Sequence, residues 1–263
     1  MAFFWHLTRL SLKQQSTYRT ALYAGLATNL FFGLLRAALM IALYAGKSEV
    51  NQLALQDAIT YVGLTQALIA FLNIFGSTDI MQTVYSGQIG SDLLKPINLY
   101  TFWLAKDLGK SMVNLAGRGV LFMLVYGIFF KISLPARLDQ WIYLLASLTL
   151  GWLASFSWRF LVNLAGLWSP DARGVARIGF TVSALLSGFI MPLRLLPDWF
   201  ANLCSLTPFP SMINTPVEIY LGVMNAPSIL NALMLQLIWL AALAVVCQVA
   251  LRAGVSRLVI QGG

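Results

Sequence analysis

Charged side chains are scarce in this chain of 263 residues, and acidic ones are the scarcest. Only 10% of the residues are charged and only nine are Asp or Glu, whereas soluble domains carry about 25% charged residues. A surface in water needs those charges, and a single dry core stops growing at roughly 250–300 residues. The composition, 59% hydrophobic, therefore excludes an ordinary soluble domain and predicts an integral membrane protein.

Histidine and cysteine are almost absent. His6 is the only histidine, and Cys204 and Cys247 are the only cysteines. A metal site or a histidine-based catalytic dyad needs partners that the chain lacks. We expect Cys204 in a polar-flanked loop and Cys247 in an apolar helix, both as packing residues without a disulfide or metal framework. We therefore predict no metal site and no catalytic residues.

A phosphate-binding loop is also missing. Gly46-Lys47-Ser48 and Gly109-Lys110-Ser111 resemble the end of one. Such a loop needs another glycine five positions before its second one, and Ile41 and Leu104 stand there instead. If the protein uses ATP, we expect another chain to bind it.

Lysine and arginine exceed the acidic residues and give a net charge of +8. They do not gather with aromatic residues as in nucleic-acid-binding proteins, so we expect no nucleic-acid partner. They flank apolar runs, and the side with more of them is cytoplasmic. Ten lie on one side: Arg9, Lys13, Arg19, Lys95, Lys106, Lys110, Arg173, Arg177, Arg252 and Arg257. Four lie on the other side: Lys47, Lys131, Arg137 and Arg194. Both termini are therefore predicted to be cytoplasmic.

Long apolar segments dominate the chain, and a helix needs roughly 20 residues to cross the hydrocarbon. We place six spans at 21–45, 58–78, 111–130, 141–167, 178–192 and 228–251. Residues 1–20 have Phe3, Phe4, Leu7 and Leu10 on one helical face, which is typical of a helix on the membrane surface. The predicted fold class is an all-α membrane protein with six transmembrane helices and an N-terminal interfacial helix.

Two connections are long enough to have a function. The cytoplasmic one, 79–110, contains a segment of alternating apolar and polar residues with turn-forming Gly87 and Gly90. It predicts a short surface helix, which either docks into a groove on another protein or only covers lipid headgroups.

The extracytoplasmic connection, 192–227, is apolar but broken by Pro192, Pro197, Pro208, Pro210 and Pro216. Irregular backbone at membrane depth is tolerated only inside protein or along a cavity. We predict re-entrant short helices at 197–206 and 212–221, with an ordinary folded loop as the alternative.

Three arginines, Arg36, Arg118 and Arg159, fall inside apolar runs. Arg159 is near the cytoplasmic end of its segment, where its side chain can extend to the interface, and Arg118 could do the same. Arg36 is too deep for that. We expect no acidic residue well inside a span, so the partner of Arg36 is a carbonyl, another subunit, a lipid phosphate or the cargo. Together with nearby aromatic residues, an unpaired cation suits an amphipathic anion, which makes Arg36 a candidate for the substrate pathway. The alternative is a structural role, in which Arg36 holds the helices together and never contacts cargo.

Several segments resemble the membrane subunits of type-2 ATP-binding cassette exporters, over the whole chain. The segment Gly87-Gln88-Ile89…Leu93-Leu94-Lys95-Pro96 is similar to the family's region between the second and third spans. Ser187-Gly188…Pro192…Pro197-Asp198-Trp199…Pro208-Phe209 is similar to the region after the fifth span, and Pro216…Ile219-Tyr220-Leu221-Gly222 continues it. The ending Arg257…Gly263 is typical of a bacterial branch with two related permeases and one ATPase.

The resemblance implies a single permease domain, 1–263, in the bacterial inner membrane. It implies two copies of a partner ATPase that bind ATP and Mg²⁺, a second permease subunit and contact with membrane lipid. The implied coupling segment is 79–100, with Gly87, Ile89, Leu93, Leu94, Lys95 and Pro96 at the ATPase. The implied extracytoplasmic gate contains Pro192, Pro197, Trp199, Pro208 and Phe209. The alternatives are a channel or secondary transporter, for which paired intramembrane charges are expected, and a membrane-embedded lipid-modifying enzyme, for which clustered acids or histidines are expected.

Overall fold

The computed structural model describes residues 2–256, and these are mostly helical. The helices of the first half are α1 (Ala2–Thr17), α2 (Arg19–Tyr44), α3 (Leu55–Leu72), α4 (Asp79–Tyr85), α5 (Ile89–Leu93), α6 (Leu99–Asn114), the π-helix η1 (Leu115–Val120) and α7 (Leu121–Phe129). The second half contains α8 (Leu138–Leu164), η2 (Ala165–Leu167), α9 (Arg173–Leu186), η3 (Leu193–Leu195), α10 (Asp198–Ser205), η4 (Phe209–Ser211), α11 (Asn214–Leu221) and α12 (Ala226–Val255). Two short antiparallel strands, β1 (Glu49–Val50) and β2 (Leu53–Ala54), form a hairpin with Val50 opposite Leu53.

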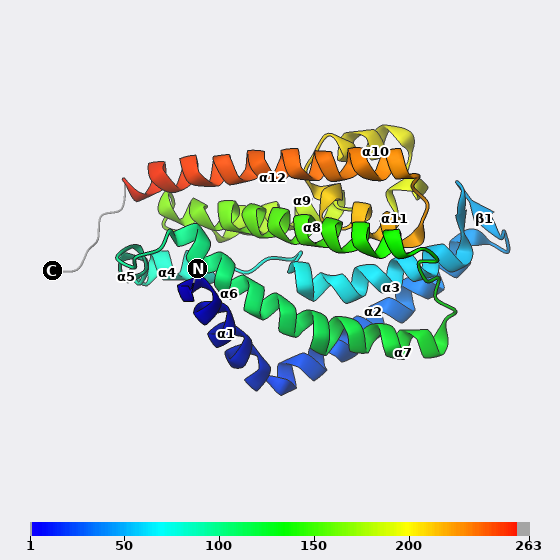
Figure 1. Cartoon of the computed structure of the whole chain (residues 1–263), viewed down its shortest axis with the longest axis horizontal. Helices are drawn as coiled ribbons and strands as arrows, with labels where there is room; N and C mark the ends of the chain where they lie inside the picture. The colour runs from blue at the N-terminus through cyan, green and yellow to red at the C-terminus, as the bar shows by residue number, and fades with distance from the viewer. Residues whose placement is uncertain (1, 257–263) are drawn as a thin grey trace.

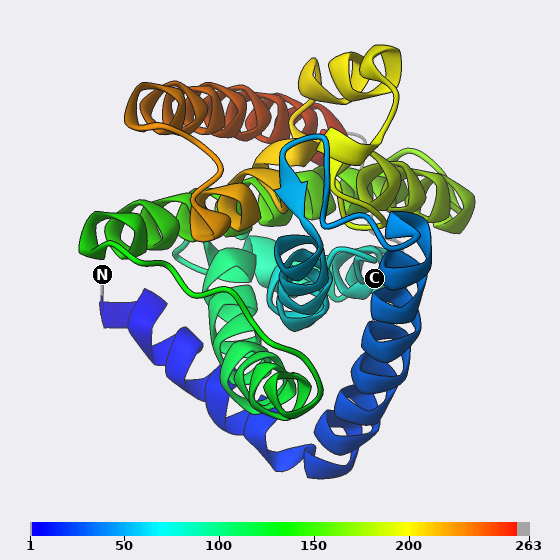
Figure 2. The ribbon, with the colours of Figure 1, turned by 90° about the vertical axis from the view of Figure 1, so that its right-hand side faces the viewer.

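The long helices run side by side along the longest axis of the molecule (Figure 1). The short helices α4 and α5 lie at one end, where α8 and α12 also end, while β1, α10 and α11 lie toward the other end (Figure 1). Viewed from the β1 end, α3 lies in the middle, between α2, α7 and α8 (Figure 2). This position explains why most residues of α3 are buried inside the protein.

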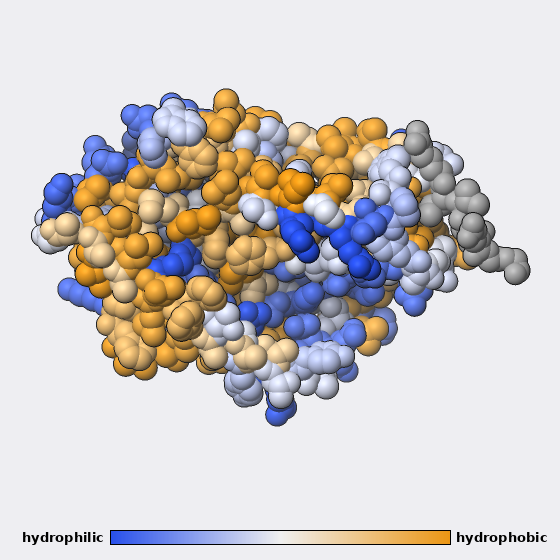
Figure 3. Space-filling model, turned by 180° about the vertical axis from the view of Figure 1, so that it is seen from behind, coloured by the Kyte–Doolittle hydropathy of each residue, from blue (hydrophilic) through white to orange (hydrophobic). Residues whose placement is uncertain are grey.

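Apolar side chains cover much of the outer surface along the bundle (Figure 3). Hydrophilic side chains on this face lie in the half toward α4 and α5 and at the opposite tip of the molecule (Figure 3). On α2 the exposed residues include Phe31, Leu35 and Leu39, and on α12 they include Leu237, Ile238 and Val245. Large exposed apolar areas are unusual for a protein surrounded by water and are expected where lipid is the solvent.

Five helices of the described chain are long and apolar enough to cross a membrane. They are Arg19–Tyr44, Leu55–Leu72, Leu99–Phe129, Leu138–Leu167 and Ala226–Val255. They correspond to the first, second, third, fourth and sixth spans predicted from the sequence. The membrane-protein class and its all-α character are thus confirmed.

The fifth predicted span, 178–192, is not helical throughout. Helix α9 contains 14 residues and ends at Leu186, so it is shorter than the roughly 20 residues of a full crossing. Gly188 follows with a φ of 79°, a left-handed conformation that L side chains rarely adopt, and Pro192 cannot continue a helix. The chain therefore bends sharply where the hydropathy pattern predicts a continuous helix.

The third predicted span, 111–130, begins too late. The side chain of Asn98 accepts a hydrogen bond from the backbone N–H of Tyr100 and starts α6 at Leu99, as N-cap residues do. From there α6, η1 and α7 continue as one helix to Phe129. Lys106, Asp107 and Lys110 therefore belong to a membrane-associated helix and not to a loop.

The N-terminal helix α1 packs along α6. A Cβ atom at Gly109 would lie 2.5 Å from the carbonyl oxygen of Thr8, so only glycine allows this close approach. The hydroxyl of Ser11 donates to the carbonyl of Lys106 at 2.6 Å. Helix α1 also exposes Phe3, Trp5 and Leu10, and of these Phe3 and Leu10 belong to the apolar face predicted for a membrane-surface helix.

Candidate functional site

A buried ion pair connects α6 to α8 near the end of the molecule that holds α4. Both terminal nitrogens of Arg159 contact the carboxylate of Asp107, at 2.7 and 2.9 Å, and the side chains are only 6% and 10% exposed. The indole N–H of Trp152 donates to the same carboxylate at 2.9 Å. Bidentate pairing of this kind fixes geometry as well as charge.

This pair gives Arg159 a partner that sequence reasoning did not identify. Asp107 belongs to the long helix formed by α6, η1 and α7 and binds the guanidinium of Arg159. Sequence reasoning missed Asp107 because Lys106 and Lys110 flank it and make the stretch look like a connection. The N-cap Asn98, just after Pro96, was the signal that the helix begins earlier.

One turn along α8, Asn163 holds the start of α4. Its side-chain oxygen accepts from the backbone N–H of Met81 at 3.0 Å, and its side-chain nitrogen donates to the carbonyl of Ser77 at 2.8 Å. At the other end of α4, the hydroxyl of Tyr85 accepts from the backbone N–H of Ala172 at 2.6 Å. Helix α4 is therefore attached both to α8 and to the start of α9.

The residues proposed for coupling divide between two environments. Ile89 is buried and Leu93 is partly buried, both in an apolar cluster with residues of α8 and α12. Leu94 is 88% exposed at the end of α5, and Pro96 is also exposed. Leu94 and Pro96 therefore give this end of the molecule an exposed apolar contact point.

Gly87 and Lys95 shape the same segment. Gly87 separates α4 from α5 with a φ of 75° and has open space around it. The ammonium group of Lys95 contacts the carboxylate of Asp92 at 2.5 Å and lies 4.0 Å from the centre of the Phe102 ring. Lys95 thereby ties the exposed turn to α6.

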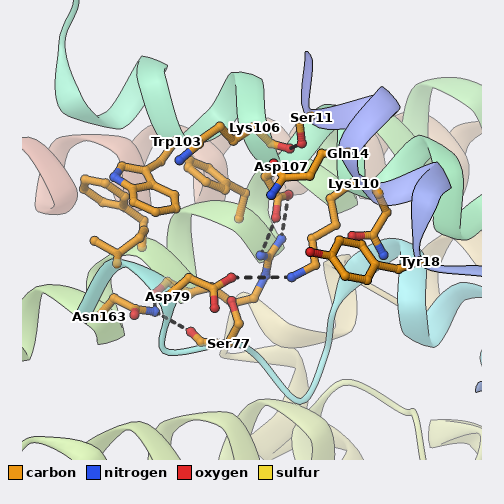
Figure 4. A pocket seen from close by; sticks show the side chains of 15 residues that line it. Ser11, Gln14, Tyr18, Ser77, Asp79, Trp103, Lys106, Asp107, Lys110 and Asn163 are labelled. Carbon is orange, nitrogen blue, oxygen red and sulfur yellow. Dashed lines mark hydrogen bonds and ion pairs between the residues drawn. The ribbon is translucent and has the colours of Figure 1, made fainter. Parts of the chain in front are cut away.

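A polar pocket of about 270 Å³ lies next to the ion pair, between α1, α4, α6 and α8. Figure 4 shows side chains from these helices pointing toward one another around it. Sequence reasoning did not predict this pocket, because its residues come from segments far apart in the chain.

At the opposite end, Asn214 organises the segment after α9. Its side-chain oxygen lies 2.9 Å from the hydroxyl of Tyr61 on α3 and accepts weakly from the backbone N–H of Leu193 at 3.3 Å. The Tyr61 hydroxyl is also 2.8 Å from the carbonyl oxygen of Gly188. Nearby, Arg194 and Glu218 form an ion pair at 2.8 Å.

The residues proposed for the gate do not form one cluster. Pro192 and Phe209 are buried, and the Phe209 ring packs edge-on against Trp158 of α8 at 5.0 Å between centres. Trp199 is 71% exposed on α10, which begins directly after Pro197. Short helices are present where the sequence predicts them, as α10 and α11. Cys204 lies buried in α10, so its placement in a loop was wrong.

Arg36 reaches the bend that follows α9. Its guanidinium donates to the carbonyls of Phe189 and Ile190, the latter at 2.9 Å, and to the hydroxyl of Thr65 at 3.2 Å. It also lies 4.8 Å from the centre of the Phe189 ring. The sequence left several kinds of partner open for the Arg36 cation. In the structure, backbone carbonyls are among the groups that accept its hydrogen bonds.

A large apolar groove opens on the side of the bundle, with a volume of about 810 Å³. It is bordered by α3, α7, α8 and α11, and among its lining residues are Leu124, Trp141, Val217 and Tyr220. Helix α11 belongs to the segment that follows α9, so residues of this segment form part of the wall of the groove. Within residues 2–256, no group of three or more metal-ligating side chains is found.

An all-α chain with five helices long and apolar enough to span a membrane, within the residues that the structure describes, defines the class of multi-pass membrane proteins. The chain belongs to the ABC-2 family transporter proteins, whose family model matches residues 30–262. It is therefore the membrane subunit, or permease, of an ATP-binding cassette transporter, and family membership implies an ATPase partner. No match was found among curated proteins.

Proposed function

We propose that this permease is the transmembrane subunit of an exporter, and that α4 and α5 dock on the partner ATPase. The observation that carries the proposal is the double attachment of α4, through Asn163 to α8 and through Tyr85 to Ala172. A displacement of this short segment cannot remain local, because both contacts lead into helices of the bundle. The exposed Leu94 supplies the docking contact.

The same connections suggest how the force travels. Two ATPase copies that bind ATP and Mg²⁺ would close and push the α4–α5 segment. Helix α9 starts beside Tyr85 and leads to Gly188, whose carbonyl contacts Tyr61. A shift of α9 would thus disturb the outer segment around Asn214. Such a movement between two packed arrangements is a rigid-body transition.

We propose six crossings, and the path of the chain supports this number. Helix α8 ends near α4, and α10 lies toward the opposite end (Figure 1), so the connection between them must pass the bundle. In this proposal, the 14-residue α9 and the bent residues after it complete the fifth crossing. Both termini are then cytoplasmic, in agreement with the excess of Lys and Arg on the side of α4 and α5.

The apolar groove supports a hydrophobic or amphipathic cargo. A groove of about 810 Å³ falls within the usual range for small-molecule sites of roughly 300–1,000 Å³. Its wall includes Pro216, Val217 and Tyr220 of α11. We propose that α10 and α11 act as an extracytoplasmic gate that is re-entrant in the membrane.

The assembly is proposed from the resemblance of the sequence to its branch of exporters. It contains a second, related permease and two ATPase copies in a bacterial inner membrane. The lipid-exposed surfaces of α2 and α12 leave room for contact with such a second subunit.

The docking assignment is tested with Leu94→Asp. Since Leu94 is 88% exposed, the change should leave insertion and thermal stability unchanged, while a buried charge at the ATPase contact should weaken it by roughly 2–4 kcal/mol. The measurements are co-purification of the ATPase and cargo-stimulated ATP hydrolysis in proteoliposomes. Leu138→Asp is the matched control, because Leu138 is 81% exposed at the start of α8. Normal co-purification and hydrolysis in the Leu94 variant would refute the assignment.

A further inference from the structure

The polar pocket beside the ion pair carries an excess of positive charge. Its ionisable lining residues are Asp79, Lys106, Asp107, Lys110 and Arg159. The carboxylate of Asp107 is fully engaged with Arg159. Asp79 reaches Lys110 only at 3.5 Å, and the side chains of Lys110 and Asp79 are 36% and 59% exposed.

Lys106 has no carboxylate within 4.0 Å in the part of the chain that the structure describes. Its ammonium group instead lies 4.3 Å from the centre of the Trp103 ring and 4.9 Å from that of Phe102. Figure 4 shows this side chain and Trp103 on the same side of the pocket. A cation held over aromatic rings keeps its capacity to donate hydrogen bonds to an anion.

Arg159 adds a second unused donor. Its side chain is only 6% exposed, and its Nε–H has no acceptor among residues 2–256. A buried donor without an acceptor is costly, and Arg159 lines the pocket. An anion in the pocket would meet lysine ammonium groups and this arginine together.

The position of the pocket indicates where the anion comes from. One wall is formed by Ser11, Gln14 and Gln15 of α1 and by Tyr18 directly after it. The chain then turns into the apolar span that begins at Arg19. The same helix exposes Phe3, Trp5 and Leu10. The pocket therefore lies at the level where hydrocarbon gives way to headgroups.

We infer that this pocket binds the phosphate group of a membrane phospholipid. Lys106 and Lys110 donate to the phosphate oxygens, Arg159 adds positive charge to the wall of the site, and the polar side chains of α1 surround the headgroup. The inference depends on the chain being embedded in a membrane and does not depend on the docking of α4 and α5. A bound lipid would join α1 to α6 beside the Asp107–Arg159 pair.

The test is native mass spectrometry of the full chain in detergent, titrated with phosphatidylglycerol. Lys106→Gln should weaken binding about tenfold, because a charge-assisted hydrogen bond is lost, and Lys106→Arg should keep it. Lys13→Gln is the matched control, since Lys13 is exposed on α1 and does not line the pocket. Lys110→Gln gives a second variant at the more exposed edge of the site.

Two results would overturn the inference. One is undiminished phosphatidylglycerol binding in both Lys106→Gln and Lys110→Gln. The other is displacement of the lipid by inorganic phosphate at an equal concentration, which would make the ligand a soluble anion. Lipid binding that is reduced in both variants, and is insensitive to inorganic phosphate, supports a phospholipid site. None of these outcomes depends on ATPase coupling.

Discussion

At the scale of single residues, the pair formed by Asp107 and Arg159 is the most constrained charge interaction of the bundle. Taking two charges out of water costs free energy, which close bidentate contacts offset. Here the carboxylate also accepts from Trp152. The pair therefore fixes α6 relative to α8 directly beside the attachment of α4.

Asp107→Asn should destabilise the protein by about 3–5 kcal/mol, because it leaves the buried cation of Arg159 uncompensated. The measurement is the free energy of unfolding in detergent. Asp171→Asn is the control, since Asp171 is exposed and lies 4.0 Å from Arg173. Adding Arg159→Gln to the first variant should recover part of the loss, and no recovery would contradict the pairing as its cause.

Arg36 is the residue for which the sequence left two roles open, a structural one and contact with cargo. Its hydrogen bonds to two backbone carbonyls and Thr65 favour a role in holding the bend after α9 over contact with cargo. Arg36→Gln should therefore reduce transport of an anionic and a neutral hydrophobic compound equally, and lower the unfolding temperature. Transport assays in proteoliposomes with both compounds measure this. Selective loss of the anion would instead place Arg36 on the substrate pathway.

At the scale of elements, two glycines with positive φ end short helical units in different surroundings. A Cβ atom at Gly188 would lie 2.6 Å from the Tyr61 hydroxyl and 3.0 Å from Asn214, whereas one at Gly87 would meet nothing within 4 Å. At Gly188 a side chain is disfavoured both by the positive φ and by the neighbouring atoms. At Gly87 it is disfavoured by the positive φ alone.

Gly87→Ala should therefore cost about 1 kcal/mol from backbone strain, and Gly188→Ala should cost more because the contacts of Tyr61 and Asn214 are displaced as well. Thermal unfolding in detergent measures both. Equal destabilisation of the two variants would show that the contacts around Gly188 add nothing to its conformational preference.

Hydropathy located most elements but not their ends. The last span, predicted at 228–251, is α12 from Ala226 to Val255, and its cap is visible in the sequence as Asn225, whose side chain accepts from Ser228. The second span ends at Leu72 and not near residue 78, because Asn73 adopts a left-handed conformation and stops α3. Hydropathy averages over a window, so it does not respond to one residue that terminates a helix.

At the scale of the whole molecule, the path of the chain predicts that the α4–α5 end and the β1–β2 hairpin face opposite sides of the membrane. A membrane-impermeant maleimide should label Asn51→Cys in intact cells and Ser91→Cys only after permeabilisation. Both positions are exposed. The reverse labelling would invert the proposed orientation.

The native cysteines should give little background in this experiment. Cys204 and Cys247 are both buried, and burial raises the pKa of the Cys204 thiol, which lowers the fraction of reactive thiolate at neutral pH. The unmodified chain is the control. Its labelling under both conditions measures the background directly.

The sequence by itself determined the class of protein, because hydropathy and charge report directly on whether a segment prefers lipid or water. It also located the short helices α4 and α5 and the short helices α10 and α11 between the long ones, since proline and glycine mark the places where long helices end. Only the tertiary structure decided which charges pair, that Arg159 meets Asp107 across 52 residues, and that α1, α4, α6 and α8 enclose one polar pocket. These features depend on the relative rotation and depth of separate helices, which arise from packing between distant segments and leave no periodic signal along the chain.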